Sequence, residues 1–205
     1  MRTPLVILSL ALSVALPSCA PRQVIALPAG GIDKKLSTFA FMEEGLLLTF
    51  IVDARTTRDR GNEKFVPFEI AVLNRGLKDL TLTRESFTLI DSEGNRYPCA
   101  SPRELLEGYN PLDFDRRLAE LDGILANRFS ANTRYPSMFS PVRAAQVTPF
   151  TSTLVRDTIS VPQHGYIIDY LYFPTPKGGV LGKRFEMFLN APELTDPVFV
   201  KFVVK

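Results

Sequence analysis

Residues 65–73 constrain the fold most, because their side chains alternate between two faces and one of those faces is wholly apolar. The apolar face carries Val66, Phe68, Ile70 and Val72. A period of two residues is that of a β-strand, in which successive side chains point to opposite sides of the sheet. The apolar face has to be covered, so this segment predicts a strand whose sheet packs against other elements. Asn74, Arg75 and Gly76 follow as a turn that ends the strand.

Other short runs of β-branched and aromatic residues follow, each bounded by Gly, Asn or Pro. The expected strands cover residues 46–52, 80–82, 87–91, 96–97, 158–161, 166–173 and 198–204. Gly94 lies between two of these runs, where it predicts a tight hairpin turn. Short strands separated by such turns are typical of an antiparallel β-sandwich, so we expect a mainly-β fold.

One part of the chain carries helix signals instead, over about residues 101–130. Ser101 and Glu104 form a capping box, and Gly108 ends a first short helix. A second helix is expected after Asn110, because the apolar side chains that follow recur at helical spacing. Its expected apolar face consists of Phe114, Leu118, Leu121, Leu125 and Phe129. We expect a helical insertion that packs on an edge or an end of the sheet, with a partner-binding helix as the alternative.

Residues 132–149 form a long connection after the helices. Such connections are often functional or disordered, but aromatic and Met side chains argue against full disorder here. Tyr135, Met138 and Phe139 either pack over the edge of the domain or form a surface for a partner. With this connection included, the insertion covers residues 101–145.

The first residues of the chain predict export. Arg2 precedes a run of apolar and small residues at positions 5–16, which is shorter than the roughly 20 residues that span a bilayer. Residues 16–19 (LPSC) then resemble the lipobox of bacterial lipoproteins, with Pro17 as a departure from the usual pattern. The resemblance implies a diacylglycerol on the Cys19 thiol and cleavage of the leader before Cys19.

Ala20, the residue after Cys19, affects two predictions: which membrane holds the lipoprotein, and where else the leader could be cleaved. In enterobacteria-like cells an Asp at this position retains a lipoprotein at the inner membrane, so Ala20 implies the outer membrane of a diderm, facing the periplasm or the cell surface. The alternatives are ordinary secretion with cleavage after Ala20, or an uncleaved apolar anchor. We expect a signal peptide over residues 1–18, a lipid-anchored tether over 19–31, and the sandwich domain over 32–205.

The composition excludes several classes of protein. The chain has 24 Lys and Arg against 22 Asp and Glu, without a basic stripe, so nucleic acid is not an expected partner. Apolar residues make up 45% of the chain, which is enough for an ordinary core. Its two cysteines cannot build a disulfide scaffold. If Cys19 is lipidated, Cys99 is expected to be a free thiol with a packing role.

No segment carries the residue pattern of a catalytic, metal or cofactor site. His164, the one histidine, stands in an expected turn without a second ligand or a nucleophile motif. Residues 177–184 lack the glycine spacing and the Ser or Thr of a phosphate-binding loop. Residues 91–95 lack the acidic spacing of a calcium loop. We expect no enzymatic activity, no cofactor and no metal. A pair of catalytic carboxylates that lie far apart in the sequence, as in glycosidases, is the open alternative.

Several of the turn and strand patterns together resemble bacterial immunoglobulin-like lipoproteins of unknown function. These patterns lie at residues 73–76, 87–97, 162–165, 173–174 and 199–204. The likeness covers roughly residues 45–100 and 155–205, and the helical insertion departs from it. It implies an immunoglobulin-like β-sandwich that serves as an extracytoplasmic binding or structural module, and it transfers no catalytic residues.

The sequence thus predicts a membrane-anchored lipoprotein that acts as a non-enzymatic interaction or structural module of the cell envelope. An envelope protein is its expected partner, and the lipid on Cys19 is its link to the membrane. A small-ligand or carbohydrate-binding lipoprotein is one alternative, which would need a pocket with convergent polar groups. An envelope hydrolase is the other, which would need perturbed titratable residues in a cleft.

Overall fold

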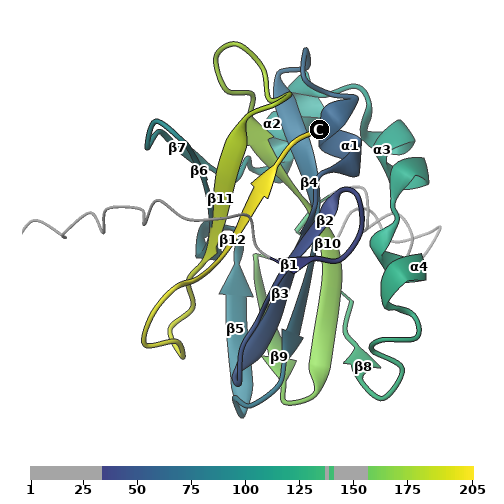
Figure 1. The fold of residues 1–205 in the computed structure, drawn as a ribbon, viewed down its shortest axis with the longest axis vertical. Helices are drawn as coiled ribbons and strands as arrows, with labels where there is room; N and C mark the ends of the chain where they lie inside the picture. The colour runs from purple at the N-terminus through teal and green to yellow at the C-terminus, as the bar shows by residue number, and fades with distance from the viewer. Residues whose placement is uncertain (1–33, 137–138, 141–156) are drawn as a thin grey trace, which may run out of the picture. The chain divides into compact units, whose positions relative to one another are not determined.

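A computed structural model describes residues 34–136, 139–140 and 157–205, which belong to one compact unit (Figure 1). Its largest sheet contains, in spatial order, β1 (Lys34–Lys35), β2 (Ala40–Glu44), β3 (Leu48–Asp53), β4 (Phe65–Asn74), β10 (Gly165–Pro174) and β8 (Thr133–Arg134). All neighbours in this sheet are antiparallel except β8, which pairs with β10 in parallel. The long central pair β4 and β10 forms the frame on which both faces of the fold are built.

A second sheet of four strands lies opposite the first. Its order is β12 (Val198–Val203), β11 (Arg184–Leu189), β6 (Phe87–Asp91) and β7 (Arg96–Pro98), all antiparallel. A two-stranded sheet of β5 (Asp79–Thr83) and β9 (Thr158–Pro162) lies at the lower end of Figure 1. A short 3-10 helix, η1 (Arg84–Ser86), connects β5 to β6.

The main core lies between the two large sheets, where the predicted apolar face of β4 is buried. Phe68 of β4 meets Phe202 of β12 with ring centroids 5.3 Å apart, and Phe202 also contacts the rings of Phe41 and Phe185. Val66, Ile70 and Val72 belong to the same cluster, together with Met187 and Val200 of the second sheet. The prediction of a mainly-β sandwich is therefore confirmed, while its likeness to immunoglobulin domains stays a prediction.

The opposite face of β4 is also buried, because helices cover it. These helices are α1 (Arg55–Arg58), α2 (Pro102–Gly108), α3 (Leu112–Leu118) and α4 (Leu121–Leu125). Leu121 and Leu125 pack on Ala71 and Leu73 of β4 in one cluster. Leu105 and Tyr109 pack near Phe65, Tyr170 and Tyr172 in another. The helical insertion is thus a third layer over the face of the large sheet, so its expected position on an edge or an end of the sheet is wrong. Strand β4 is covered on both sides.

The capping box of the first predicted helix is confirmed. The Ser101 hydroxyl accepts a hydrogen bond from the Glu104 amide at 3.3 Å, and the Ser101 amide donates to the Glu104 carboxylate at 2.8 Å. Because each side chain satisfies an amide that the helix leaves without an internal partner, α2 begins at Pro102.

The prediction of one continuous helix after Asn110 is wrong, since two short helices, α3 and α4, occur in its place. The Glu69 carboxylate of β4 accepts hydrogen bonds from the amides of Glu120 and Leu121 at 2.8 and 3.0 Å, and so fixes the start of α4. Phe114 is also not on the buried face: it is 51% exposed. Asp115 points inward instead, because Arg60 and two tyrosines hold its carboxylate.

The turn between β9 and β10 depends on two unusual positions. His164 has a φ of 63°, which lies in the left-handed region that residues other than Gly rarely adopt. A Cβ on Gly165 would lie 2.8 Å from the Tyr135 ring and 2.9 Å from the Pro162 carbonyl oxygen. Gly165 is therefore needed for close packing, and His164 carries the turn conformation.

The predicted hairpin turn at Gly94 is confirmed, with a φ of 84°.

Candidate functional site

The candidate site begins with the hairpin tip that joins β2 to β3. The sequence predicted a strand from residue 46, but β3 begins at Leu48, and Leu46 and Leu47 belong to the turn. The Gly45 amide donates to the Leu48 carbonyl oxygen at 2.9 Å, which closes the turn. Leu46 is 93% exposed and Leu47 is 44% exposed. Two neighbouring leucines thus stand in solvent on a hydrogen-bonded turn.

The neighbouring turn after β4 holds this hairpin tip in place. The Leu47 carbonyl oxygen accepts hydrogen bonds from the amides of Arg75 and Gly76, at 2.8 and 3.0 Å. A Cβ on Gly76 would lie only 3.1 Å from the Leu46 carbonyl oxygen, so the two turns pack backbone to backbone. Because the backbone is fixed, the main chain at Leu46 would lose little conformational freedom on binding.

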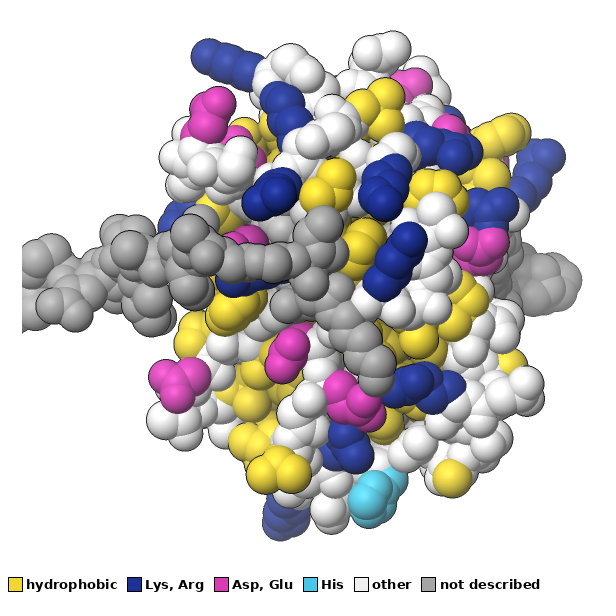
Figure 2. All heavy atoms as spheres, in the orientation of Figure 1, with side chains coloured by type: hydrophobic (Ala, Val, Ile, Leu, Met, Phe, Trp, Pro, Cys, Tyr) yellow, Lys and Arg dark blue, Asp and Glu magenta, His cyan; other side chains and the backbone are white. Residues whose placement is uncertain are grey.

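A hollow of about 510 Å³ lies beside the tip. Its lining residues are Glu44, Leu46, Leu73, Arg75, Arg128, Phe129, Asn132 and His164. They come from the ends of β2 and β4, from the segment after α4 and from the turn before β10. Figure 2 shows the histidine at the lower end of the molecule, close to acidic and basic side chains. We call Leu46, Leu47 and the lining of this hollow the hairpin-tip surface.

One carboxylate is shared by two guanidinium groups in the hairpin-tip surface. The Glu44 carboxylate accepts from Nη1 of Arg75 at 3.0 Å and from Nη2 of Arg128 at 3.2 Å. Arg75 Nη1 also donates to the Gly45 carbonyl oxygen at 3.2 Å. Glu44, Arg75 and Arg128 together carry one positive charge in excess. The surface therefore combines an apolar tip with a basic hollow.

Three hydrogen bonds hold the backbone around His164. The His164 carbonyl oxygen accepts from the Thr133 amide at 3.1 Å and from the Asn132 side chain at 3.2 Å. Its amide donates to the Asn74 carbonyl oxygen at 2.8 Å. These bonds tie the turn to β4 and to the segment after α4, and so the rim of the hollow is preorganised.

Of the partner residues predicted from the long connection, Tyr135 and Phe139 do not line this hollow. Tyr135 is half-buried, and its amide donates to the Tyr166 carbonyl oxygen at 2.8 Å. Phe139 is only 2% exposed and packs 6.0 Å from the Phe87 ring, so its placement in a partner surface is wrong. The Asp169 carboxylate accepts from the Phe139 amide at 2.7 Å and draws this residue into the core. Met138, like Cys19, lies outside the described residues.

A second candidate is a buried polar cluster between the helical insertion and the large sheet. The Asp115 carboxylate accepts from Arg60 Nε at 2.8 Å, from the Tyr109 hydroxyl at 2.6 Å and from the Tyr172 hydroxyl at 3.2 Å. The Tyr170 hydroxyl donates to the Asp115 carbonyl oxygen at 3.1 Å. This cluster was not predicted from the sequence, since its members come from the loop after α1, the residue after α2, α3 and β10.

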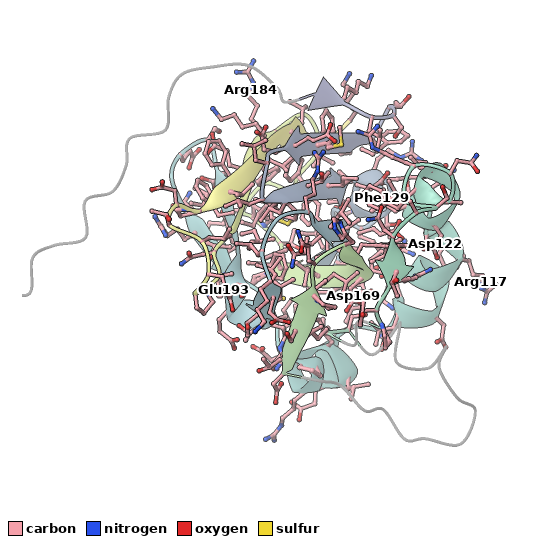
Figure 3. All side chains as sticks on the ribbon, turned by 90° about the horizontal axis from the view of Figure 1, so that it is seen from below. Arg117, Asp122, Phe129, Asp169, Arg184 and Glu193 are labelled. Carbon is pink, nitrogen blue, oxygen red and sulfur yellow. The ribbon has the colours of Figure 1, made fainter. Side chains whose placement is uncertain are left out.

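This cluster is closed to solvent, which argues against a catalytic role. Asp115 is fully buried and the two tyrosines that bind its carboxylate are at most 3% exposed. Burial raises the pKa of Tyr109, Tyr172 and Asp115, and the hydrogen bonds from Tyr109 and Arg60 oppose this effect at Asp115. In Figure 3 the labelled Arg117 and Asp122 lie on the helices that cover this side. The arrangement fits a structural role, in which hydrogen bonds join the helical insertion to the large sheet.

A shallow pocket of about 430 Å³ lies beside the β6–β7 turn, with Asp91 and Lys183 among its lining residues. The Asp91 carboxylate accepts from the Asn95 amide at 2.9 Å and from the Tyr97 hydroxyl at 2.8 Å. Burial acts to raise the pKa of Asp91, but the hydrogen bonds from Asn95 and Tyr97 outweigh it and lower that pKa. Asp91 is therefore occupied by its own turn, as expected for a hairpin.

Cys99 has the character of a packed thiol. It lies against the main core, and burial raises the pKa of its thiol to about 12. Reactive cysteines depend on thiolate, which this pKa disfavours near neutral pH. In the described parts of the chain, no three His, Cys, Asp or Glu side chains are grouped to hold a metal ion.

No helix in residues 34–136, 139–140 and 157–205 is long and apolar enough to cross a membrane.

No protein-family model matches the sequence, and no curated protein matches it. One solved structure that matches is described as a "putative lipoprotein (ycdA)" of Bacillus subtilis, with 11% sequence identity and a TM-score of 0.41. The match covers 79% of this chain but 38% of that one. A TM-score of this size does not establish a shared fold.

Proposed function

We propose that this chain is an extracytoplasmic lipoprotein, held to a membrane by a lipid on Cys19, whose sandwich binds a protein partner. The binding site is the hairpin-tip surface, and the role is non-enzymatic. The lipobox-like residues 16–19 support the anchor. The immunoglobulin-like character and an outer-membrane position in a diderm belong to the same proposal.

The exposure of Leu46 is the observation that carries this proposal. Leu46 is 93% exposed, the highest exposed fraction among the large apolar side chains of the described residues, and exposed Leu47 lies next to it. Burying one leucine side chain contributes roughly 1.5–3 kcal/mol, so Leu46 alone would add considerably to the affinity of a complex. The neighbouring Leu47 and the polar rim of the hollow complete an apolar centre with a polar border, the usual anatomy of protein interfaces.

The polar clusters of the fold favour a binding module over an enzyme. Asp115 is enclosed by Arg60 and tyrosines, and Asp91 is occupied by its own turn. Neither offers an accessible acid or base to a substrate, whereas the hairpin-tip surface lies open to solvent. A protein partner fits this surface better than a small molecule, because the hollow is open and Leu46 in its lining is 93% exposed.

Site-specific photo-cross-linking tests this function. A photoreactive phenylalanine at position 46 of the full-length chain is expected to give one discrete cross-linked protein in intact cells. Position 106 is the matched control, since Leu106 is an exposed leucine (62%) on α2 outside the hairpin-tip surface. We expect no such product there. Equal products from both positions, or none from position 46, would contradict the proposal.

A further inference from the structure

We infer that the partner presents a carboxylate to Arg75 and Arg128, next to an apolar pocket that receives Leu46. This inference rests on the proposed function and specifies the chemistry of its partner. It starts from the charge balance of the hollow, in which Glu44 is the one acidic lining residue beside two arginines. A single carboxylate can neutralise only one of the two guanidinium groups.

The geometry leaves these arginines accessible to a second carboxylate. The side chains of Arg75 and Arg128 are 43% and 34% exposed, and each contacts Glu44 through one terminal nitrogen. A guanidinium group has five N–H donors in a planar fork that matches the two oxygens of a carboxylate. An approaching acidic side chain can therefore bind without displacing Glu44.

The position of Arg75 places the charge beside the apolar tip. Its Nη1 donates to the carbonyl oxygen of Gly45, the residue directly before Leu46. A partner that covers Leu46 therefore has its own side chains within reach of this guanidinium. The complementary surface is an acidic residue at the rim of an apolar pocket, on an extracytoplasmic protein.

The same arrangement predicts how charge changes alter binding. Removing the two arginine charges should weaken the complex, whereas removing the Glu44 charge should strengthen it, because both guanidinium groups then lose the carboxylate that they share. A purely structural role for this ion-pair group predicts the opposite sign for Glu44, since the loss of any member would loosen the turn. Glu44→Gln thus separates the two explanations.

The test uses the full-length chain with the photoreactive residue at position 46, in envelope preparations at low and high salt. We expect the double variant Arg75→Gln, Arg128→Gln to lower the yield of the cross-linked protein by roughly tenfold, and Glu44→Gln to raise it. Arg134→Gln is the matched control, because Arg134 is equally exposed (43%) but pairs with Asp122 outside the hollow. Its yield should not change.

The outcomes separate this inference from the proposed function. An unchanged yield in the double arginine variant would overturn the carboxylate inference and leave partner binding through Leu46 intact. A fall in yield for Glu44→Gln would also overturn it, in favour of a structural ion-pair group. The absence of any cross-link from position 46 would overturn both. Mass spectrometry of the cross-linked peptide should find Asp or Glu next to the attachment point, and a lipid adduct there instead of a peptide would refute a protein carboxylate.

Discussion

Replacing Asp115 with Ala is expected to destabilise the domain by about 3–5 kcal/mol, the cost of breaking a buried ion pair by removing one partner. The substitution leaves the Arg60 guanidinium, whose side chain is 11% exposed, without its counterion. It also removes the acceptor of the Tyr109 and Tyr172 hydroxyls, both of which are buried. Urea unfolding of the purified protein, followed by circular dichroism, measures the change in the free energy of unfolding.

Asp113→Ala is the matched control, because Asp113 lies on the same helix, two residues away, and is exposed. Its loss removes a favourable charge from the first turn of α3, which should cost less than about 1 kcal/mol. Similar losses for the two variants would show that the Asp115 cluster does not join the helical layer to the sheet.

Replacing Phe202 with Ala is expected to cost a similar amount, about 3–5 kcal/mol, for a different reason. The Phe202 ring lies between the sheets and contacts the rings of Phe41, Phe68 and Phe185, at centroid distances of 6.1, 5.3 and 6.0 Å. Truncation removes buried apolar surface and leaves a cavity that the paired strands cannot easily close. The same urea titration measures the effect.

Phe114→Ala is the control for Phe202→Ala, since it removes the same side chain from an exposed position. Phe114 is 51% exposed and is contacted by Arg60 with a guanidinium-to-centroid distance of 5.1 Å. A cation–π contact is worth about 0.5–1 kcal/mol where the ring is exposed to solvent, as half of Phe114 is, so the loss should remain near that value. A loss for Phe202→Ala no greater than this would mean that the interface between the sheets is not the main core.

The buried face of β4 could be predicted from the sequence because a strand period is a local property. Residues 65–73 alternate, and their apolar face does lie against the second sheet. The capping box of α2 was equally predictable, since Ser101 and Glu104 are three residues apart. Both features depend on interactions within one short segment.

The break between α3 and α4 could not be predicted in this way. Glu69 fixes the start of α4 although it is 51 residues away from Glu120 in the sequence. The apolar spacing suggested one continuous helix. Such spacing indicates which side of a helix is apolar, but it does not show contacts with residues far away in the sequence, such as Glu69. The inward position of Asp115 has the same origin, since Arg60 and Tyr172 come from distant elements.

The hairpin tip was missed because a run of leucines looks alike in a strand and in a turn. Residues 46–48 are all Leu, yet only Leu48 begins β3. The position of the turn depends on Gly76, which packs against Leu46 and Leu47 from a neighbouring connection. Strands β2 and β11 were also not predicted, although β11 shows alternating burial.

The mass of the mature N-terminus, measured on protein isolated from the membrane fraction of its native cells, tests the lipid anchor directly. We expect an N-terminal peptide that begins at Cys19 and carries the mass of a diacylglycerol on its thiol. A Cys19→Ser variant should lose this modification. An unmodified peptide that begins at Pro21, or one that still begins at Met1, would contradict the lipid anchor and with it the proposed place of this protein in the cell envelope.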